Sequence, residues 1–398
     1  MASTIDRESS ALFKPLTIGN GTLTIGHRVV HAPLTRLRGV AVREGTPEDP
    51  CREWMVDDMV IDYYTQRATE GGLMITEGVA VNVEAGSLPG IPGLFVPEQV
   101  QAWKKLVDAV HAKGAKIYAQ LWHAGRTSVS LLIGSDALCA SAVALEDEMC
   151  WAAGVKFEDY PPKEMTQEDI NRTIEAFAKC AVSAVEEAGF DGVEIHGGNG
   201  YIIDQFLNSN TNQRTDKYGG SPENRCRFPL EIMESVIKAI GQDKVALRLT
   251  PFGLYNGTRG EQRLETWGYL CKEIKRQWEL SYIHFIEPRY EQIIVPEEKE
   301  KFLASWGMPD ITLAPFREIF GKTPFFAAGG YNDTNSWGVI ESGTYDAIVY
   351  GRYFLANPDF VYRLRNGIKF NKYNRDRFYG PFPDRHVGYV DYPRHDEL

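Results

Sequence analysis

The chain has 398 residues, of which 43% are hydrophobic and 24% charged, and this is typical of a soluble globular protein that buries a large core without disulfides or metals. Its net charge of -11 argues against nucleic acid or an anionic membrane as the main partner. No apolar stretch is long enough to span a bilayer.

Signals for cellular location point in two directions. The first residues contain no apolar run behind a basic start, so they do not resemble a signal peptide. The chain nevertheless ends in His395-Asp396-Glu397-Leu398, a signal for retention in the endoplasmic reticulum. Because that signal is read only after entry into the compartment, we expect a cytoplasmic protein. A mobility shift on endoglycosidase treatment would overturn this expectation.

The six cysteines are scattered along the chain. They form no CxxC pair and no Cys/His cluster with the spacing of metal ligands. We therefore expect reduced thiols and no metal site.

A β-hairpin is predicted near the start of the chain. Two short apolar-alternating runs flank Asn20-Gly21 within residues 16–25, and Asn-Gly favours a tight turn with positive φ at both positions. A regular alternation of short β-rich runs and longer amphipathic stretches follows.

Eight short apolar runs predict strands, several of them apolar enough to be buried on both faces. They cover residues 28–35, 73–81, 116–122, 192–196, 244–250, 282–287, 324–328 and 345–350. The clearest helical patterns between them cover residues 97–113, 166–188, 222–240 and 263–279.

This alternation predicts an α/β fold, a (β/α)₈ TIM barrel in one domain that spans residues 1–398, with the N-terminal hairpin closing the bottom of the barrel. A doubly wound open sheet is the alternative, but no G-x-G-x-x-G fingerprint follows the first strand. Residues 122–166 form a long excursion after the third strand. Two interpretations stay open for it, a substrate lid and a plain surface insertion.

Polar residues gather where the predicted strands end, which in such a barrel is the catalytic face. The fourth strand runs into His196, Asn199 and Tyr201. Two neutral donors, His196 and Asn199, can converge on one carbonyl oxygen and stabilise the enolate that forms on hydride addition. A protonated phenol such as Tyr201 can then give a proton to the α-carbon.

The loops after the last two strands indicate a phosphate site. Gly329-Gly330 and Gly351 let backbone N–H groups approach an anion, and Arg352 can form a bidentate contact with it. Arg248 ends the fifth strand inside an apolar run, where it needs an anionic or polar partner.

With these residues in view, the chain resembles the Old Yellow Enzyme family of flavoproteins, including plant oxophytodienoate reductases and fungal relatives, over nearly its whole length. The motifs that carry the resemblance are Ala32-Pro33-Leu34-Thr35-Arg36, Tyr63-Tyr64-Thr65-Gln66-Arg67-Ala68, Ile75-Thr76-Glu77-Gly78, Ala119-Gln120-Leu121-Trp122-His123-Ala124-Gly125-Arg126, Gly192-Val193-Glu194-Ile195-His196, Arg214-Thr215-Asp216-Lys217-Tyr218-Gly219-Gly220-Ser221, Glu223-Asn224-Arg225 and Gly351-Arg352 with Asn357-Pro358-Asp359.

The resemblance implies a role for each candidate residue. His196 and Asn199 would bind the substrate carbonyl, and Tyr201 would be the proton donor. FMN would be held by Thr35 at its C4 carbonyl, by Gln120 at the pyrimidine edge and by Arg248 at N1/C2=O. The full cofactor set that it implies is Pro33, Thr35, Gln120, Arg248, Gly329, Gly330, Gly351 and Arg352, and the implied substrate pocket is Trp122, Phe378 and Tyr379.

The implied activity is that of an ene-reductase, an NADPH dehydrogenase that reduces the C=C bond of α,β-unsaturated aldehydes and ketones. NADPH or NADH would reduce FMN, and after exchange of ligands a hydride from flavin N5 would reach the β-carbon while Tyr201 protonates the α-carbon. Monomer and homodimer both stay open. The alternative is a flavin-dependent isomerase or cyclase that acts on a natural-product intermediate without net reduction.

Overall fold

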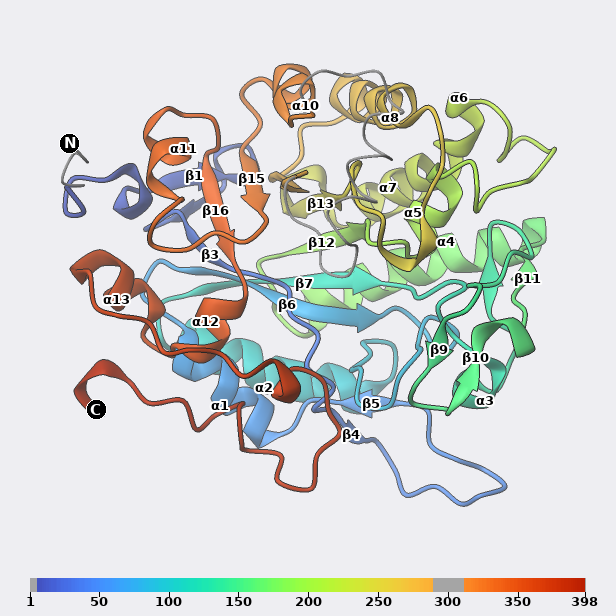
Figure 1. Ribbon diagram of the computed structural model, residues 1–398, viewed down its shortest axis with the longest axis horizontal. Helices are drawn as coiled ribbons and strands as arrows, with labels where there is room; N and C mark the ends of the chain where they lie inside the picture. Colours follow the sequence, from blue (N-terminus) through green and yellow to red (C-terminus); the bar gives the residue numbers. More distant parts are fainter. Residues whose placement is uncertain (1–5, 289–310, 398) are drawn as a thin grey trace.

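The structure, a computed structural model, describes residues 6–288 and 311–397 and contains a closed barrel of eight parallel strands (Figure 1). In spatial order the strands are β12 (Gly192–Gly197), β13 (Val245–Leu249), β14 (Ile283–Ile286), β15 (Phe325–Ala328), β16 (Ala347–Tyr350), β3 (Val29–His31), β6 (Leu73–Ala80) and β7 (Lys116–Trp122). All eight predicted strands are present, and the closed barrel excludes the open doubly wound sheet.

Strand β12 shows how the alternation of side chains builds both the core and the site. Val193 and Ile195 are fully buried in the main hydrophobic core, while Glu194 and His196 are also buried but belong to the other face of the strand. Successive side chains of a strand point to opposite faces, so Glu194 and His196 point into the barrel. The apolar residues therefore secure the strand, and the polar ones line its interior.

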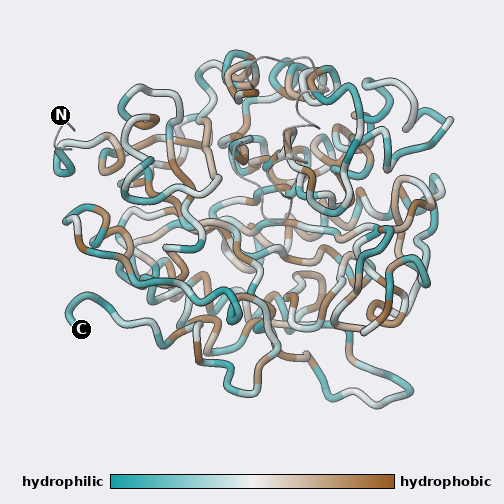
Figure 2. The backbone as a smooth tube through the Cα atoms, viewed as in Figure 1, coloured by the Kyte–Doolittle hydropathy of each residue, from teal (hydrophilic) through white to brown (hydrophobic). Residues whose placement is uncertain are grey.

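The longer helices pack around the barrel. They are α1 (Asp58–Arg67), α2 (Pro97–His111), α4 (Gln167–Val182), α7 (Arg227–Ile240), α8 (Arg263–Gln277), α10 (Ala314–Phe320) and α13 (Phe360–Asn366). Shorter helices are α3 (Ser130–Ile133), α5 (Ile202–Leu207), α6 (Pro222–Arg225), α11 (Trp337–Glu341) and α12 (Arg352–Ala356). Hydrophilic residues lie mainly on the outer helices and loops (Figure 2).

Two predicted helices differ in detail from the structure. The one expected over residues 166–188 begins with a Thr166–Asp169 capping box and ends in a π-helical turn over Ser183–Glu187. The one expected over residues 222–240 is divided at Cys226 into α6 and α7. Pro229 has no N–H to donate to the carbonyl of Arg225, which explains the break.

The N-terminal hairpin closes the bottom of the barrel as predicted. Strands β1 (Leu16–Ile18) and β2 (Leu23–Ile25) pair in antiparallel register, with φ of 54° at Asn20 and 93° at Gly21. Ile18 and Ile25 are buried in one cluster with inward-facing barrel residues. The amide of Gly19 donates to the carbonyl of Ser281, two residues before the start of β14.

The excursion after β7 contains only small pieces of regular structure. Strands β8 (Leu138–Cys139) and β11 (Lys163–Glu164) pair in parallel, and β9 (Met149–Cys150) and β10 (Val155–Lys156) form a hairpin. A further short pair is β4 (Val40–Ala41) with β5 (Trp54–Met55). All six cysteines are free thiols. Within the described residues, no helix is long and apolar enough to cross a membrane.

Candidate active site

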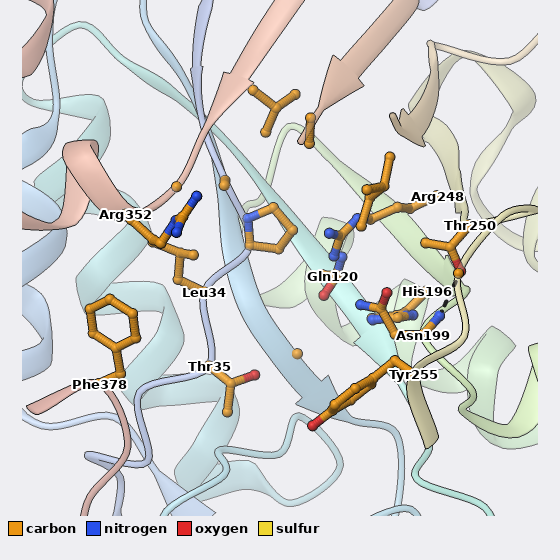
Figure 3. A pocket seen from close by; sticks show the side chains of 18 of the residues that line it. Leu34, Thr35, Gln120, His196, Asn199, Arg248, Thr250, Tyr255, Arg352 and Phe378 are labelled. Atoms are coloured by element: carbon orange, nitrogen blue, oxygen red, sulfur yellow. Dashed lines mark hydrogen bonds between the residues drawn. The ribbon is translucent and has the colours of Figure 1, made fainter. Parts of the chain in front are cut away.

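A cavity of about 310 Å³ opens at the C-terminal ends of the barrel strands (Figure 3). Its walls include all fourteen residues that the sequence singled out. These are Pro33, Thr35, Gln120, Trp122, His196, Asn199, Tyr201, Arg248, Gly329, Gly330, Gly351, Arg352, Phe378 and Tyr379.

The turn after β12 is held in one conformation by neighbouring loops. Asn199 has a φ of 55°, in the left-handed region, where Asn is one of the better tolerated residues. Its backbone N–H donates to Thr250 Oγ1 at 2.8 Å, and its backbone carbonyl accepts from Asn256 Nδ2 at 2.9 Å. A Cβ at Gly198 would lie 2.5 Å from Thr250 Oγ1, so any other residue at this position would require the Thr250 side chain to move. Asn199 is thus fixed beside His196.

His196 is a neutral donor of defined orientation. Burial lowers its pKa well below 6.5, and the charge of Arg248 lowers it further, so the ring is uncharged at neutral pH. Its Nδ1 accepts the amide N–H of Gly198 at 3.3 Å, which leaves the ring proton on Nε2. His196 can therefore give one hydrogen bond from Nε2 to an oxygen in the cavity without bringing a positive charge.

Tyr201 packs edge-to-face on two aromatic rings of the site. The ring centroids lie 5.1 Å from Trp122 and 5.1 Å from His196. Burial raises the pKa of the Tyr201 phenol above 10, with a smaller contribution from Tyr255. The hydroxyl is therefore protonated at neutral pH and can act as an acid.

The opposite part of the cavity suits a group with an anionic end. Gly329 and Gly330 have φ of 130° and 74°, so their backbone stands in the cavity wall without a Cβ. Two guanidinium groups, Arg248 and Arg352, line the same cavity, and Arg352 Nη1 is held by the hydroxyl of Tyr373 at 3.2 Å. Exposed glycine backbone and two arginines fit FMN, whose phosphate and pyrimidine edge both require such donors.

The aromatic pair near the C-terminus is held over the cavity by buried arginines. Arg36 Nε donates to the carbonyl of Phe378 at 2.9 Å, and the amide of Gly380 donates back to the carbonyl of Arg36 at 3.0 Å. Arg38 Nη2 reaches the carbonyl of Arg377 at 3.1 Å. Phe378 is buried and Tyr379 is about half exposed, so the pair lines the cavity from the interior to the protein surface.

Several residues that line the cavity were not assigned to it from the sequence. Thr250 directly follows the fifth strand, and its position at a strand end was a usable signal. Trp151, at the tip of the β9–β10 hairpin, carried no such signal, because the excursion shows no periodic pattern. Both line the cavity, and Trp151 is 54% exposed.

Comparisons with known proteins show a family match and similar relatives. The model of the NADH:flavin oxidoreductase / NADH oxidase family matches residues 11–371. The flavin oxidoreductase hxnT of Emericella nidulans is 41% identical over 391 residues, which cover 96% of this chain and 97% of that protein. A probable inactive dehydrogenase, easA of Claviceps fusiformis, is 38% identical over 391 residues, with coverage of 97% and 95%.

A solved structure of an Old Yellow Enzyme is also similar to this chain. The Old Yellow Enzyme from Pichia sp. AKU4542 superposes with a TM-score of 0.83 at 32% identity, over 98% of this chain and 95% of that one.

Proposed function

Since the chain belongs to the Old Yellow Enzyme family of flavin oxidoreductases, we propose that it is an FMN-dependent ene-reductase that uses NAD(P)H to reduce the C=C bond of α,β-unsaturated aldehydes and ketones. A relative is itself called a probable inactive dehydrogenase, so membership alone does not carry this proposal. What carries it is the complete set of His196, Asn199 and Tyr201 in one cavity with the residues that fit FMN.

His196 and Asn199 bind the substrate through its carbonyl oxygen. The Nε2–H of the neutral imidazole and the side-chain amide of Asn199 donate to this oxygen and stabilise the charge that develops on it. Each preorganised donor of this kind contributes about 3 kcal/mol in the transition state. The same pair holds the carboxamide of the nicotinamide, so the reductant and the enone occupy the site alternately.

Tyr201 completes the addition across the double bond. FMN, when bound, supplies the hydride that adds to the β-carbon. Tyr201 gives its phenolic proton to the α-carbon, and the enolate electron pair forms the new C–H bond. Its contacts with Trp122 and His196 keep the phenol beside the bound carbonyl compound.

The remaining assigned residues hold the cofactor. Gly329, Gly330, Gly351 and Arg352 bind the phosphate, and Arg248 and Gln120 bind the pyrimidine edge. Thr35 and Pro33 contact the ring system from the end of the first barrel strand. Trp122, Phe378 and Tyr379 form the walls around the substrate.

Product analysis tests this function. The purified holoenzyme is given NADPH and cyclohexenone, with NADH in a parallel assay, and the product is identified by mass spectrometry. Net reduction adds two hydrogens to the substrate for each nicotinamide oxidised. An isomer or cyclised product of unchanged mass, formed without consumption of NADPH or NADH, would favour the isomerase or cyclase alternative instead.

A further inference from the structure

A buried carboxylate is hydrogen-bonded to a residue of the cavity wall and is not used by the chemistry above. Glu194 is completely buried, and its two oxygens accept three hydrogen bonds. Gln120 Nε2 donates to Oε1 at 2.7 Å, and Oε2 lies 3.1 Å from the hydroxyl of Tyr282 and 2.9 Å from Nδ1 of His284. Gln120 lies on β7, His284 on β14 and Tyr282 directly before β14, so the carboxylate on β12 joins three strands of the barrel.

The register relates this carboxylate to the proposed substrate and cofactor groups. Glu194 lies two residues before His196 on β12, on the same inner face, and opposite Gln120 on β7. His196 lies opposite Arg248 on β13, which in turn lies opposite His284 on β14. Gln120 and Arg248 line the cavity (Figure 3), whereas Glu194 and His284 are not among the lining residues.

Glu194 carries a full negative charge in this place. Burial by itself raises the pKa of its carboxyl, but His284, Arg248 and the hydrogen bond from Gln120 outweigh it and hold the pKa below 4.5. The charge is the counterpart of Arg248, a buried cation in the wall of the cavity.

The hydrogen bond to Gln120 also fixes the orientation of its amide. Nε2 is the only donor atom of a glutamine side chain, and it is directed to Glu194. The amide oxygen is then the atom left to face the cavity. An oxygen there accepts the N–H of a pyrimidine imide, whereas a flipped amide would present N–H groups to it.

We propose that Glu194 is a positioning residue for the cofactor, which turns the Gln120 amide oxygen towards the cavity and offsets the charge of Arg248 beneath the flavin. This inference rests on FMN binding as proposed above. Two-electron reduction with uptake of one proton leaves FMN with a negative charge on its pyrimidine edge. A carboxylate below that edge therefore opposes reduction, and it keeps the midpoint potential lower than Arg248 alone would set it.

The midpoint potential of bound FMN tests this role through Glu194→Gln. The substitution removes the charge and keeps one acceptor oxygen for Gln120, while its new NH2 group faces Tyr282 and His284, whose oxygen and ring nitrogen can each accept a hydrogen bond. At an effective dielectric constant of about 20, the loss of one buried charge near the pyrimidine edge corresponds to about a tenfold change in an equilibrium. In dye-linked titrations of the holoenzyme, the ratio of reduced to oxidised FMN at the wild-type midpoint should rise about tenfold.

Two further variants separate this role from a structural one. Asp359→Asn removes another buried carboxylate, which binds Arg363 and His395 away from the cavity, and should leave the potential unchanged. Tyr282→Phe removes one donor to Glu194, leaves its charge less neutralised and should lower the potential, opposite to Glu194→Gln.

A wild-type potential in Glu194→Gln overturns the proposal. If Glu194→Gln does not fold, a wild-type potential in Tyr282→Phe overturns it instead. A wild-type chain that binds no FMN would overturn the proposed function together with this inference, whereas equal potentials of bound FMN overturn this inference alone.

Discussion

At the scale of single residues, the assignment of Tyr201 as proton donor makes a prediction about one half of the catalytic cycle. Tyr201→Phe removes only the hydroxyl, and loss of a general acid typically costs a factor of about 10² to 10⁴. In stopped-flow experiments, reoxidation of the reduced enzyme by an enone should slow by this order, while reduction by NADPH stays nearly unchanged. Equal slowing of both halves would contradict the assignment.

The pair of donors can be tested without turnover. Phenolate anions mimic the enolate, so they should bind between Nε2 of His196 and the side-chain amide of Asn199. His196→Ala and Asn199→Ala should each weaken phenol binding about tenfold or more, because a hydrogen bond to a charged group is lost. The charge-transfer absorbance of the phenol complex measures this. Unaltered titration curves in both variants would remove the pair from the oxyanion site.

The sequence predicted these residues because each follows an apolar strand at its C-terminal end. It could not predict how they are supported. Glu194 was named only as part of a family motif, and its partners Tyr282 and His284 lie about ninety residues further along the chain. Their contact depends on the register of a closed barrel, which no local pattern contains. The proton on Nε2 of His196 depends in the same way on the backbone of Gly198.

At the scale of elements, the excursion between β7 and α4 carries a prediction about substrate choice. The tip of its β9–β10 hairpin brings Trp151 into the wall of the cavity, with 54% of the side chain still exposed. A bulky apolar substituent on the enone would cover part of this surface. Loss of that contact corresponds to about 1 kcal/mol, or roughly fivefold.

Trp151→Ala should therefore lower kcat/KM about fivefold for an enone with a bulky apolar substituent and leave cyclohexenone unaffected. Met149→Ala is the matched control, since Met149 lies on the same hairpin, is 49% exposed and does not line the cavity. If both variants treat both enones like the wild type, the excursion is a surface insertion and not a substrate lid.

Elements were predictable where a local sequence pattern determines them. Short apolar runs predicted all eight barrel strands, although the run over residues 28–35 extends four residues beyond β3, and Asn20-Gly21 predicted the hairpin turn. Strands β4, β5 and β8 to β11 were not predicted, because each has two residues and exists only through its pairing partner. The path of residues 377–390 also escaped prediction, since it depends on carbonyl contacts with Arg36 and Arg38.

At the scale of the whole molecule, a buried acid makes stability depend on pH. Glu77 is 1% exposed, and burial raises its pKa from 4.5 to about 7 against the hydrogen bond from the Arg36 amide. Between these values the unfolded chain loses its proton while the folded chain keeps it. The free energy of unfolding therefore falls as pH rises through this window, by about 3 kcal/mol in total.

Glu77→Gln lacks this ionisation. Its melting temperature should exceed that of the wild type by an amount that grows between pH 4.5 and about 7 and is constant above that range. Thermal denaturation of the holoenzyme at several pH values measures the difference. A difference between the two proteins that does not vary with pH would contradict the buried, raised pKa of Glu77.

The alternation of strands and helices was enough to predict the closed barrel, because parallel strands buried on both faces allow few architectures. Closure is what brings His196, Arg248, Gly330 and Arg352 from separate strands to one cavity. The visible absorbance of the purified protein, recorded without oxygen, is the most direct test of FMN-dependent enone reduction. An FMN-dependent ene-reductase shows a flavin spectrum that bleaches with NADPH and returns on addition of cyclohexenone. A colourless protein that takes up no added FMN would contradict this function.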